Sequence, residues 1–528
     1  MEQANTPPVK QNGGHPLTSA DPRMNEQVES LQHPAPLSAS DSGAVQSTLA
    51  AAYPAESRLV VALVALYVFL LESRVLDLSP IWWMHIPLVL LIALTVITLA
   101  KGNFRITFQS QISRVLVLFT AWVAVCVPFS MWRSASMDPL QSQVQALLIY
   151  VIVVQAIRTP NAYRKVTGAY AYAILVASLM GFVYGRSVEN GRLALAGGTL
   201  GDPNELALSL VIGLPFWWDK AHASQGIKKL LCLLCTVPIF ISFGKAGSRS
   251  GLFTLLMLVA VTFFLASGAR KMMIAAGCLI LVVASMFVLP DYIRARYITI
   301  FSPASNANSS EVHHLESDIN SSQERKALLM QSIQMTFQNP IFGVGPGVFS
   351  YASFDQRRAS SGQGGLAQVT HNTYTQISSE TGIPGFLLFL VDMILVLRSA
   401  FSSYKRLGDT DPLLGTSGRY LFCLLMAASV GIFFLSVGYS HIVTTLFAFS
   451  AALANLQAWQ ASGAKIAAPK TVTAPSSFSS RFAFAKPAGS AASAAAHGRT
   501  PLANSKAIRA AGLKLKRNLA EPSVNKSS

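Results

Sequence analysis

A histidine stands directly before an apolar segment in the last third of the chain. His371 is followed by Asn372 and, after nine further residues, by Gly382-x-x-Gly385. Because an imidazole titrates near neutral pH, His371 can accept a proton from a hydroxyl group as that group attacks. Asn372 and Glu380 can orient the histidine or the second reactant. A hydrogen-bonded structural histidine is the competing interpretation.

Several cations lie between apolar segments, where an unpaired charge is costly. Arg192 belongs to GRLALAGGTLGDPNELA, and Lys245 and Arg249 belong to FGKAGSRSG. An arginine keeps its charge and grips phosphate oxygens through two parallel hydrogen bonds. Together these cations predict a receptor for an anion, and a lipid pyrophosphate would suit it. For any single cation, snorkelling to a lipid phosphate is the alternative.

Three other patterns resemble metal or redox sites. The Cys-x-x-Cys pattern at residues 232–235 stands alone in an apolar segment, which favours buried structural thiols. The histidine pair at 313–314 has acidic neighbours but no second anchored pair. The Asp-Thr-Asp pattern at 409–411 is expected in a solvated loop, apart from the histidine and the cations described above. We therefore predict no metal site.

The elements that position these residues are membrane helices. The chain has 528 residues, of which 52% are hydrophobic and 12% charged, against about 25% charged in ordinary soluble domains. Apolar runs of about 15–20 residues recur along it, each long enough or nearly long enough to cross a bilayer. We predict an all-α polytopic membrane protein with about twelve transmembrane helices. The predicted spans are approximately residues 59–71, 81–100, 112–130, 140–157, 166–185, 205–218, 228–243, 251–267, 272–289, 383–397, 420–437 and 441–459.

Two polar segments flank this core of residues 58–459. Residues 1–57 are rich in Pro, Gln, Ser and Asn, and residues 460–528 are rich in Ala, Ser and Pro with many basic residues. Such compositions are typical of disorder. We predict a disordered N-terminal segment and a disordered basic tail, which can contact anionic lipid.

The basic residues indicate the orientation of the core. With the N-terminus in the cytoplasm, fourteen Lys and Arg fall in inside loops and six in short outside loops. Lys and Arg collect on the cytoplasmic side of membranes, so both termini are predicted to be cytoplasmic. The net charge of +17 then reflects topology rather than nucleic-acid binding. The longest connection, residues 290–382, lies outside, with a polar and mobile stretch at 303–322 and an amphipathic helix at 323–338.

The motifs together resemble the O-antigen ligase superfamily, which includes lipopolysaccharide O-antigen ligases and related polysaccharide polymerases. The His371–Gly385 pattern fits the ligase type: His, then Asn, Ser or Gln, nine residues, and Gly-x-x-Gly. NPIFGVGPGVF, which precedes it, is similar to the family's Pro-x-x-Gly-x-Gly stretch. GDPNELA at 201–207 and SRSG at 248–251 also look like family segments. The resemblance covers about residues 58–459.

The resemblance implies a glycosyltransferase-C-like enzyme of the bacterial inner membrane, without a cofactor or an obligatory metal. Its donor is a glycan on undecaprenyl pyrophosphate, and its active site faces the periplasm. By residue matching, Arg192 and Arg249 hold the pyrophosphate, with Lys245 and Arg186 as weaker members of the cluster. His371 activates the acceptor hydroxyl, and the glycan is transferred with inversion.

The remaining matched residues, which include Asp202 and Asn204 of GDPN, have orienting or structural roles under this resemblance. The acceptor stays open: lipid A-core, a growing polysaccharide or a protein hydroxyl. Polymerases often carry Arg, ten residues, then Gly, and Arg186 with Gly197 fits that pattern only once.

Two other classes of protein remain open. A transporter of lipid-linked glycans or solutes needs charged or broken helices near the bilayer midplane, and often internal repeats. The sequence shows neither clearly, because the polar groups gather at one face. A receptor or assembly scaffold is the third possibility, which the specific histidine motif disfavours.

Overall fold

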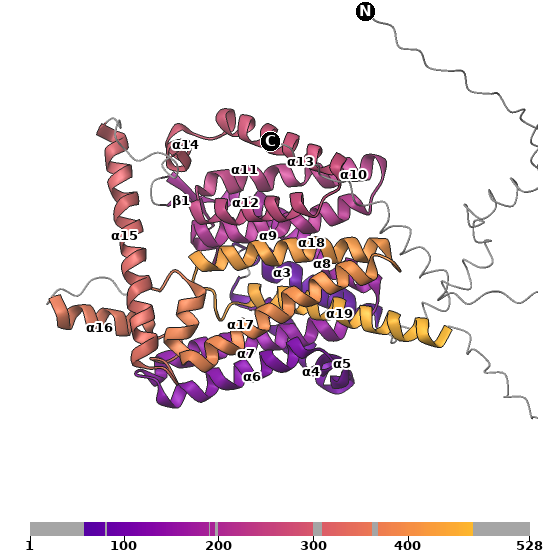
Figure 1. Ribbon diagram of the computed structural model, residues 1–528, viewed down its shortest axis with the longest axis horizontal. Helices are drawn as coiled ribbons and strands as arrows, with labels where there is room; N and C mark the ends of the chain where they lie inside the picture. The colour runs from indigo at the N-terminus through magenta and orange to yellow at the C-terminus, as the bar shows by residue number, and fades with distance from the viewer. Residues whose placement is uncertain are drawn as a thin grey trace, which may run out of the picture. The chain divides into compact units, whose positions relative to one another are not determined.

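The computed structural model describes residues 57–79, 82–188, 191–195, 199–298, 309–361 and 368–467. The two segments predicted to be disordered lie outside the described residues, except that Ser57 caps the first described helix and the last helix continues to Ala467. Long helices run side by side, and helix α15 lies across one end of them (Figure 1). His371 belongs to this end, which we call the His371 end.

The side-by-side helices form the core. They are α3 (Arg58–Ser73), α4 (Ile86–Lys101), α6 (Gln111–Cys126), α7 (Arg133–Ala156), α8 (Pro160–Tyr184), α9 (Pro203–His222), α10 (Gly226–Leu234), α11 (Thr236–Ala246), α12 (Arg249–Phe264), α13 (Gly268–Val288), α17 (Thr373–Leu407), α18 (Pro412–Gly431) and α19 (His441–Ala467).

Further elements lie in the connections between them. They are α5 (Phe104–Phe108), α14 (Asp291–Ile298), α15 (Ser309–Gln338), α16 (Phe349–Ser361), the 3₁₀ turns η1 (Trp82–Met84), η2 (Val127–Phe129), η4 (Thr199–Gly201) and η5 (Ile432–Phe434), and the strands β1 (Arg186–Val188) and β2 (Arg192–Ala194). The two strands pair antiparallel, with Val188 opposite Arg192.

Each of the twelve predicted spans coincides with helix in the structure. Among the residues described, nine helical segments are long and apolar enough to cross a membrane. The other three predicted spans are α3, α9 and α12. Helices α3 and α12 have 16 residues each, which gives a length of only about 24 Å. The protein is therefore an all-α polytopic membrane protein, and the number of twelve crossings stays a prediction.

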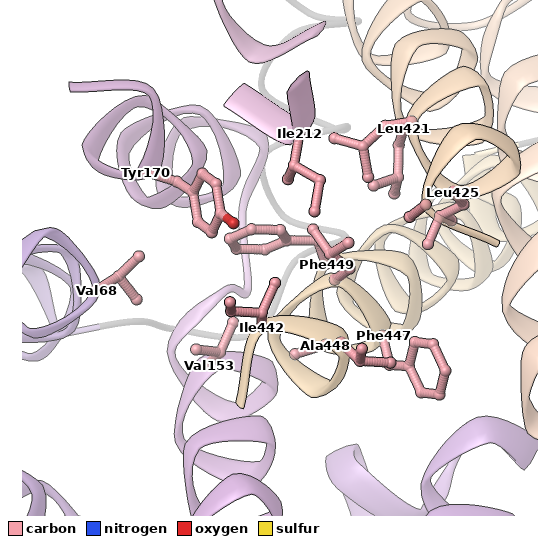
Figure 2. Packing of buried hydrophobic residues seen from close by; sticks show 14 of the residues in the cluster. Val68, Val153, Tyr170, Ile212, Leu421, Leu425, Ile442, Phe447, Ala448 and Phe449 are labelled. Atoms are coloured by element: carbon pink, nitrogen blue, oxygen red, sulfur yellow. The ribbon is translucent and has the colours of Figure 1, made fainter. Parts of the chain in front are cut away.

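The apolar core lies where α7, α8, α9, α18 and α19 meet. Figure 2 shows Phe449 of α19 among Tyr170 of α8 and Ile212 of α9. The Phe449 ring packs edge-on against Tyr170 at 5.9 Å and against Phe216 at 5.6 Å between centroids. Each such aromatic pair contributes about 0.5–1.5 kcal/mol beyond its buried area. This packing fixes the helices whose ends carry the polar groups described below.

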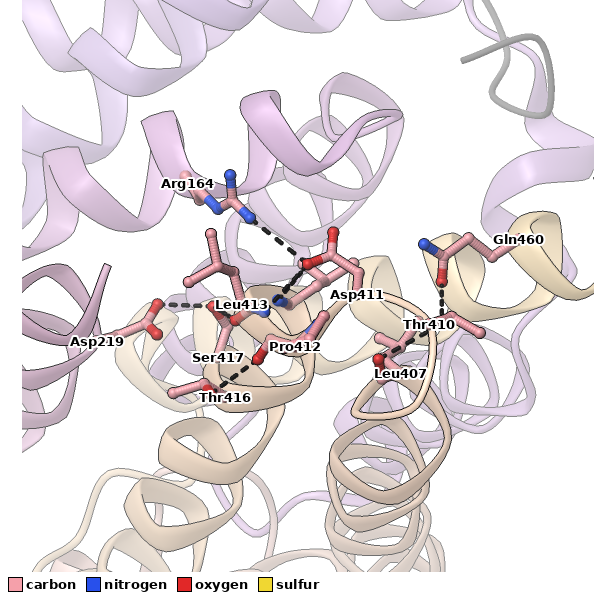
Figure 3. Close-up of polar contacts among 11 residues, drawn as sticks. Arg164, Asp219, Leu407, Thr410, Asp411, Pro412, Leu413, Thr416, Ser417 and Gln460 are labelled. Atoms are coloured by element: carbon pink, nitrogen blue, oxygen red, sulfur yellow. Dashed lines mark hydrogen bonds and ion pairs between the residues drawn. The ribbon is translucent and has the colours of Figure 1, made fainter. Parts of the chain in front are cut away.

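The Asp-Thr-Asp pattern lies at the opposite end, in the turn between α17 and α18 (Figure 3). Asp411 is the N-cap of α18 and accepts hydrogen bonds from the backbone of Leu413 at 3.1 Å and Leu414 at 3.0 Å. Arg164 lies 3.9 Å from the same carboxylate. Asp411 therefore has a structural role, because it satisfies the free N–H groups of the first turn.

The connection at the His371 end is more helical than predicted. Residues 309–322 belong to the stretch predicted to be mobile, but they form the first part of α15. No Gly or Pro interrupts residues 309–338, so the helix continues despite its polar composition. The mobility of this stretch stays a prediction. Residues 303–308 lie outside the described part. The helix predicted at 323–338 is present, but Leu328 and Met335 are its buried apolar residues, while Phe337 is exposed.

Candidate functional site

His371 stands immediately before α17 and has an unusual backbone conformation. Its φ is +50°, in the left-handed region that few residues with a side chain adopt. The next residue, Asn372, is the N-cap of α17, and its side-chain oxygen accepts hydrogen bonds from Tyr374 N at 2.9 Å and Thr375 N at 3.2 Å. Asn372 therefore caps α17, so that the helix begins directly after the histidine and its cap.

The segment between η5 and α19 holds both sides of His371. Thr370 Oγ1 lies 2.8 Å from Ser436 Oγ. Thr373 Oγ1 donates to the carbonyl of Leu435 at 2.6 Å and accepts from Val437 N at 3.1 Å. Three hydrogen bonds from this one segment therefore fix the residues that flank the histidine.

The imidazole of His371 is half-buried, and charged groups surround it. Burial and the Arg325 guanidinium lower the pKa of His371 below its usual value, against the Asp202 and Glu324 carboxylates, which raise it. The net shift is downward, so the imidazole is neutral at neutral pH. A neutral imidazole is the form that a general base needs.

Helix α17 bends at Gly382, ten residues after its N-cap Asn372. The φ of Gly382 is +71° and its ψ is −176°. The loop that follows α15 binds this bend through its backbone. Ile383 N donates to Pro340 O at 2.8 Å, and Val344 N donates to Ser379 O at 2.8 Å. The loop of residues 339–349 is therefore attached to α17 by main-chain hydrogen bonds that do not depend on side-chain identity.

Glycines are required where this loop and the bend approach each other. A Cβ atom at Gly382 would lie 2.1 Å from the carbonyl oxygen of Ile341, and one at Gly343 would lie 2.3 Å from the Glu380 carbonyl carbon. A Cβ at Gly385 would lie 2.9 Å from the Trp122 ring. The Gly-x-x-Gly half of the sequence motif therefore has a packing role in the structure.

Glu380 lies inside this contact rather than beside the histidine. Its side chain is 3% exposed, and its carboxylate accepts a hydrogen bond from Gly347 N at 2.9 Å. The described contacts of Glu380 thus hold the glycine-rich loop against α17. A role in orienting a reactant stays a prediction.

Arg192 lies at the turn between α11 and α12. It is 5% exposed, its Nε donates to Ala246 O at 3.1 Å, and its Nη2 donates to Asn204 Oδ1 at 2.8 Å. Asn204 also accepts from Ser248 Oγ at 2.8 Å. Asn204 of GDPN and Ser248 of SRSG are 44 residues apart in the sequence. Their hydrogen bond, together with that of Arg192 to Asn204, joins the two segments beside this arginine.

Two helices, α9 and α12, begin at this group of hydrogen-bonded residues. Asp202 is the N-cap of α9 and accepts from Asn204 N, and Ser248 is the N-cap of α12 and accepts from Gly251 N at 3.0 Å. Arg249, half-buried, is the first residue of α12. Side-chain capping of both helices explains why Asp, Asn and Ser stand at these positions.

The other two predicted cations differ in their placement. Lys245, in the last turn of α11, is half-buried, and its Nζ lies 5.2 Å above the ring of Phe182. Arg186 is exposed on β1, opposite Ala194. The structure thus brings Arg192, Lys245 and Arg249 to one turn, with Arg186 on the adjoining hairpin.

The prediction missed Arg296 of α14. Its Nε donates to Gly247 O at 3.0 Å, in the same α11–α12 turn, and a Cβ at Gly247 would lie 3.6 Å from Arg192 Cγ. Arg192 and Arg296 both act on Tyr297, whose pKa burial raises to about 12 despite them. The available signal was the pair Arg294 and Arg296 directly after the ninth predicted span, which a count of short loops leaves out.

Residues 233–390 match the family model described as O-antigen ligase. The matched part includes Lys245, Arg249, Arg296 and His371, whereas Arg192 and GDPN lie before it. No curated protein matches the chain. The family match confirms the resemblance to the O-antigen ligase superfamily and indicates a membrane glycan transferase of the ligase or polymerase type.

Proposed function

We propose that this chain, whose residues 233–390 match the O-antigen ligase family model, transfers a glycan from a lipid-linked donor to an acceptor within the membrane. The donor is a glycan on undecaprenyl pyrophosphate, and the acceptor is a hydroxyl group on the periplasmic face of the inner membrane. One observation carries this proposal. His371 and the cations of the α11–α12 turn lie at the same end of the core, where Asn204 in the first turn of α9 accepts a hydrogen bond from Arg192.

The cations bind the leaving group. Arg192, Arg249 and Arg296, with Lys245 beside them, hold the pyrophosphate through charge-assisted hydrogen bonds. As the bond between the anomeric carbon and the phosphate oxygen breaks, negative charge grows on the pyrophosphate. Cations that are already in place stabilise this charge without rearrangement.

His371 serves the acceptor. The acceptor oxygen attacks the anomeric carbon from the face opposite the pyrophosphate, and its proton passes to the imidazole of His371. The new glycosidic bond therefore has inverted configuration, and undecaprenyl pyrophosphate leaves. A positioned general base of this kind contributes about 10²–10⁴ to a rate.

A deletion in the native host tests the proposal. The deletion strain is complemented with wild type and with His371→Ala, and lipopolysaccharide, secreted polysaccharide and carrier-linked glycan are extracted. Loss of the lipopolysaccharide ladder with accumulation of polymerised glycan on the carrier identifies a ligase. Collapse of a polymer to single repeat units on the carrier identifies a polymerase.

One result of the same experiment counts against glycan transfer, namely unchanged glycan pools in the deletion strain. A lipopolysaccharide ladder from the histidine variant that matches wild type would remove the general base from the mechanism.

One observation favours transport as the second candidate. Asp392 of α17 is 1% exposed, and within the described part of the chain neither of its carboxylate oxygens has a hydrogen-bond partner. Acids inside a membrane often mark the path of an ion or substrate. Transport of a lipid-linked glycan predicts that Asp392→Asn stops glycan export while His371→Ala does not. Glycan transfer predicts that His371→Ala stops transfer and leaves glycan on the carrier, whereas Asp392→Asn does not.

A further inference from the structure

We infer that α15 is an interfacial helix whose exposed apolar side chains lie in the lipid leaflet at the His371 end of the protein. These side chains are Met330, Ile333 and Phe337, which we call the α15 stripe. The partner of this surface is the lipid itself, so the inference goes beyond the proposed reaction and does not depend on it.

The α15 stripe is opposite the face through which α15 packs on α16. Leu328 and Met335 of α15 are buried in a small apolar cluster with Phe349 of α16. Met330 follows Leu328 by two positions, and Phe337 follows Met335 by two, which is about 200° around a helix. Phe337 is 73% exposed. The stripe therefore points away from α16.

Helix α16 lies on the side of α15 that is farther from the core helices (Figure 1). The two helices are in direct contact, because Gln331 Nε2 donates to Ser353 O at 3.2 Å and to Gln356 Oε1 at 3.0 Å. A face of α15 opposite α16 is thus turned toward the membrane. Because the α15 stripe is exposed there, it lies beside the core helices, where lipid surrounds the protein.

The end of α15 meets α17 at the level where α17 enters the membrane. Ile341 is exposed just after α15, and its carbonyl oxygen would lie 2.1 Å from a Cβ at Gly382. Ile383 N donates to Pro340 O at 2.8 Å. The predicted span of α17 begins at residue 383, so Ile341 is at the edge of the hydrocarbon layer.

From this level on, α17 has an exposed apolar stripe of its own. Its residues recur every three or four positions on one face of the helix, and they are Ile383, Leu387, Val391 and Ile394. On a helix that is long and apolar enough to cross a membrane, such a face contacts lipid. Ile341 and the α15 stripe extend this lipid-facing surface onto the His371 end.

The distribution of charge agrees with this placement. Residues 327–354, which contain the α15 stripe and the glycine-rich loop, include no acidic or basic residue. Lys326 is exposed one turn before Met330, on the same side of the helix. A lysine there covers apolar surface with its stem and reaches lipid phosphate with its ammonium group. An apolar face with a basic residue at its edge is typical of helices that lie in the interface.

The placement connects the candidate site to the membrane surface. Thr336 Oγ1 of α15 lies 2.9 Å from Ser378 Oγ, and Ser378 stands between His371 and the bend of α17. The loop after α15 holds the bend itself. An interfacial α15 therefore fixes the height of this part of α17 relative to the lipid headgroups.

Electron paramagnetic resonance of spin-labelled cysteines tests the inference. The full-length protein is reconstituted in vesicles of phosphatidylethanolamine and phosphatidylglycerol. The buried native cysteines Cys126 and Cys423 stay, and the three half-buried ones are replaced by alanine. The measurement compares how often each label collides with oxygen, which concentrates in hydrocarbon, and with a nickel chelate, which stays in water.

The labelled positions are all exposed, so the substitutions leave the packing intact. Met330→Cys and Phe337→Cys place labels on the α15 stripe. Gln338→Cys is the matched control, since it lies about 100° away on the same turn of helix. Leu387→Cys on α17 is the lipid-facing standard. We expect the ratio of oxygen to nickel collisions at residues 330 and 337 to approach that at residue 387 and to exceed that at residue 338.

Each other outcome overturns the inference. Equal ratios at residues 337 and 338 would place the α15 stripe in water. A label at residue 337 that neither reagent reaches would show that protein covers the stripe, and spin–spin broadening would then identify a second copy of the chain as the cover. Since none of these measurements uses glycan transfer, their failure leaves the proposed function standing, and an active His371→Ala leaves this inference standing.

Discussion

His371 carries a backbone conformation that a side chain makes unfavourable, by roughly 1–2 kcal/mol for an L-residue in the left-handed region. The hydrogen bonds of Thr370 and Asn372 hold it there. Conformations of this kind persist where the surroundings fix them, often at functional sites. If His371 is held in this conformation for function, replacing it should affect activity without reducing stability.

His371→Gly should leave the protein as thermally stable as wild type or more stable, because glycine adopts this φ without a steric cost. Transfer should fall by about 10²-fold or more, since the base is lost. His85, exposed and with a φ of +46°, is the matched control: His85→Gly should be equally stable and fully active. Thermal unfolding in detergent and transfer assays measure both. A stable and active His371→Gly would show that the histidine is not the base.

Arg296 and Arg294 provide a matched pair on α14. Arg296 faces the α11–α12 turn, whereas Arg294 pairs with Asp291 and donates to Met286 O at 2.9 Å. A charge-assisted hydrogen bond contributes about 1.5–3 kcal/mol, so Arg296→Gln should raise the KM for the carrier-linked donor about 10-fold or more. Arg294→Gln should leave that KM unchanged. Equal effects of the two variants would mean that α14 acts through its fold alone.

At the scale of elements, the bend of α17 is the most constrained feature. Gly382→Ala would place a Cβ against the Ile341 carbonyl and force a positive φ, so we expect a loss of at least about 1–3 kcal/mol of stability. A Cβ at Gly277 of α13 would have no atom within 4 Å, so Gly277→Ala is the control and should be neutral or slightly stabilising. Size-exclusion profiles after heating compare the two. A Gly382→Ala protein that survives like Gly277→Ala would contradict the packing described here.

The sequence predicted the helices well because apolar runs in a membrane protein leave few alternatives. It did not predict the helix at residues 309–322, where the absence of Gly and Pro lets α15 extend through a polar segment. In the amphipathic helix predicted at 323–338, Leu328 is buried, whereas Ile333 and Phe337 are exposed. A hydroxyl contact of 2.9 Å joins Thr336 of α15 to Ser378 of α17.

In the candidate site, too, local sequence patterns predicted some residues, whereas contacts made only through packing were missed. Motif spacing pointed to His371, Arg192 and Arg249, since glycines and charges between apolar spans are unusual. It did not find Arg296, because that arginine reaches the α11–α12 turn only through the packing of α14. Nor did it show that Asn204 joins Arg192 to Ser248, because a contact between residues 44 apart leaves no local pattern.

At the scale of the whole molecule, the orientation is the main prediction. Met131 is 66% exposed near the His371 end, and Asp409 is exposed in the turn at the opposite end. With both termini cytoplasmic, a membrane-impermeant maleimide should label Met131→Cys in intact spheroplasts and Asp409→Cys only after lysis. The wild-type protein, with its five native cysteines, gives the background. The reverse labelling pattern would mean that the protein has the opposite orientation in the membrane, with His371 on the cytoplasmic side.

The short length of α12 has a consequence for the lipid around it. Its 16 residues span about 24 Å, against a hydrocarbon layer of about 30 Å, and Phe253, Leu256 and Phe264 are exposed along it. A bilayer beside such a helix thins to avoid exposing its chains. Since α12 begins at Arg249, a carrier lipid that approaches along this helix brings its headgroup down toward the arginine. Hydrophobic mismatch would then recruit the donor, and transfer in short-chain lipids should be faster than in long-chain lipids.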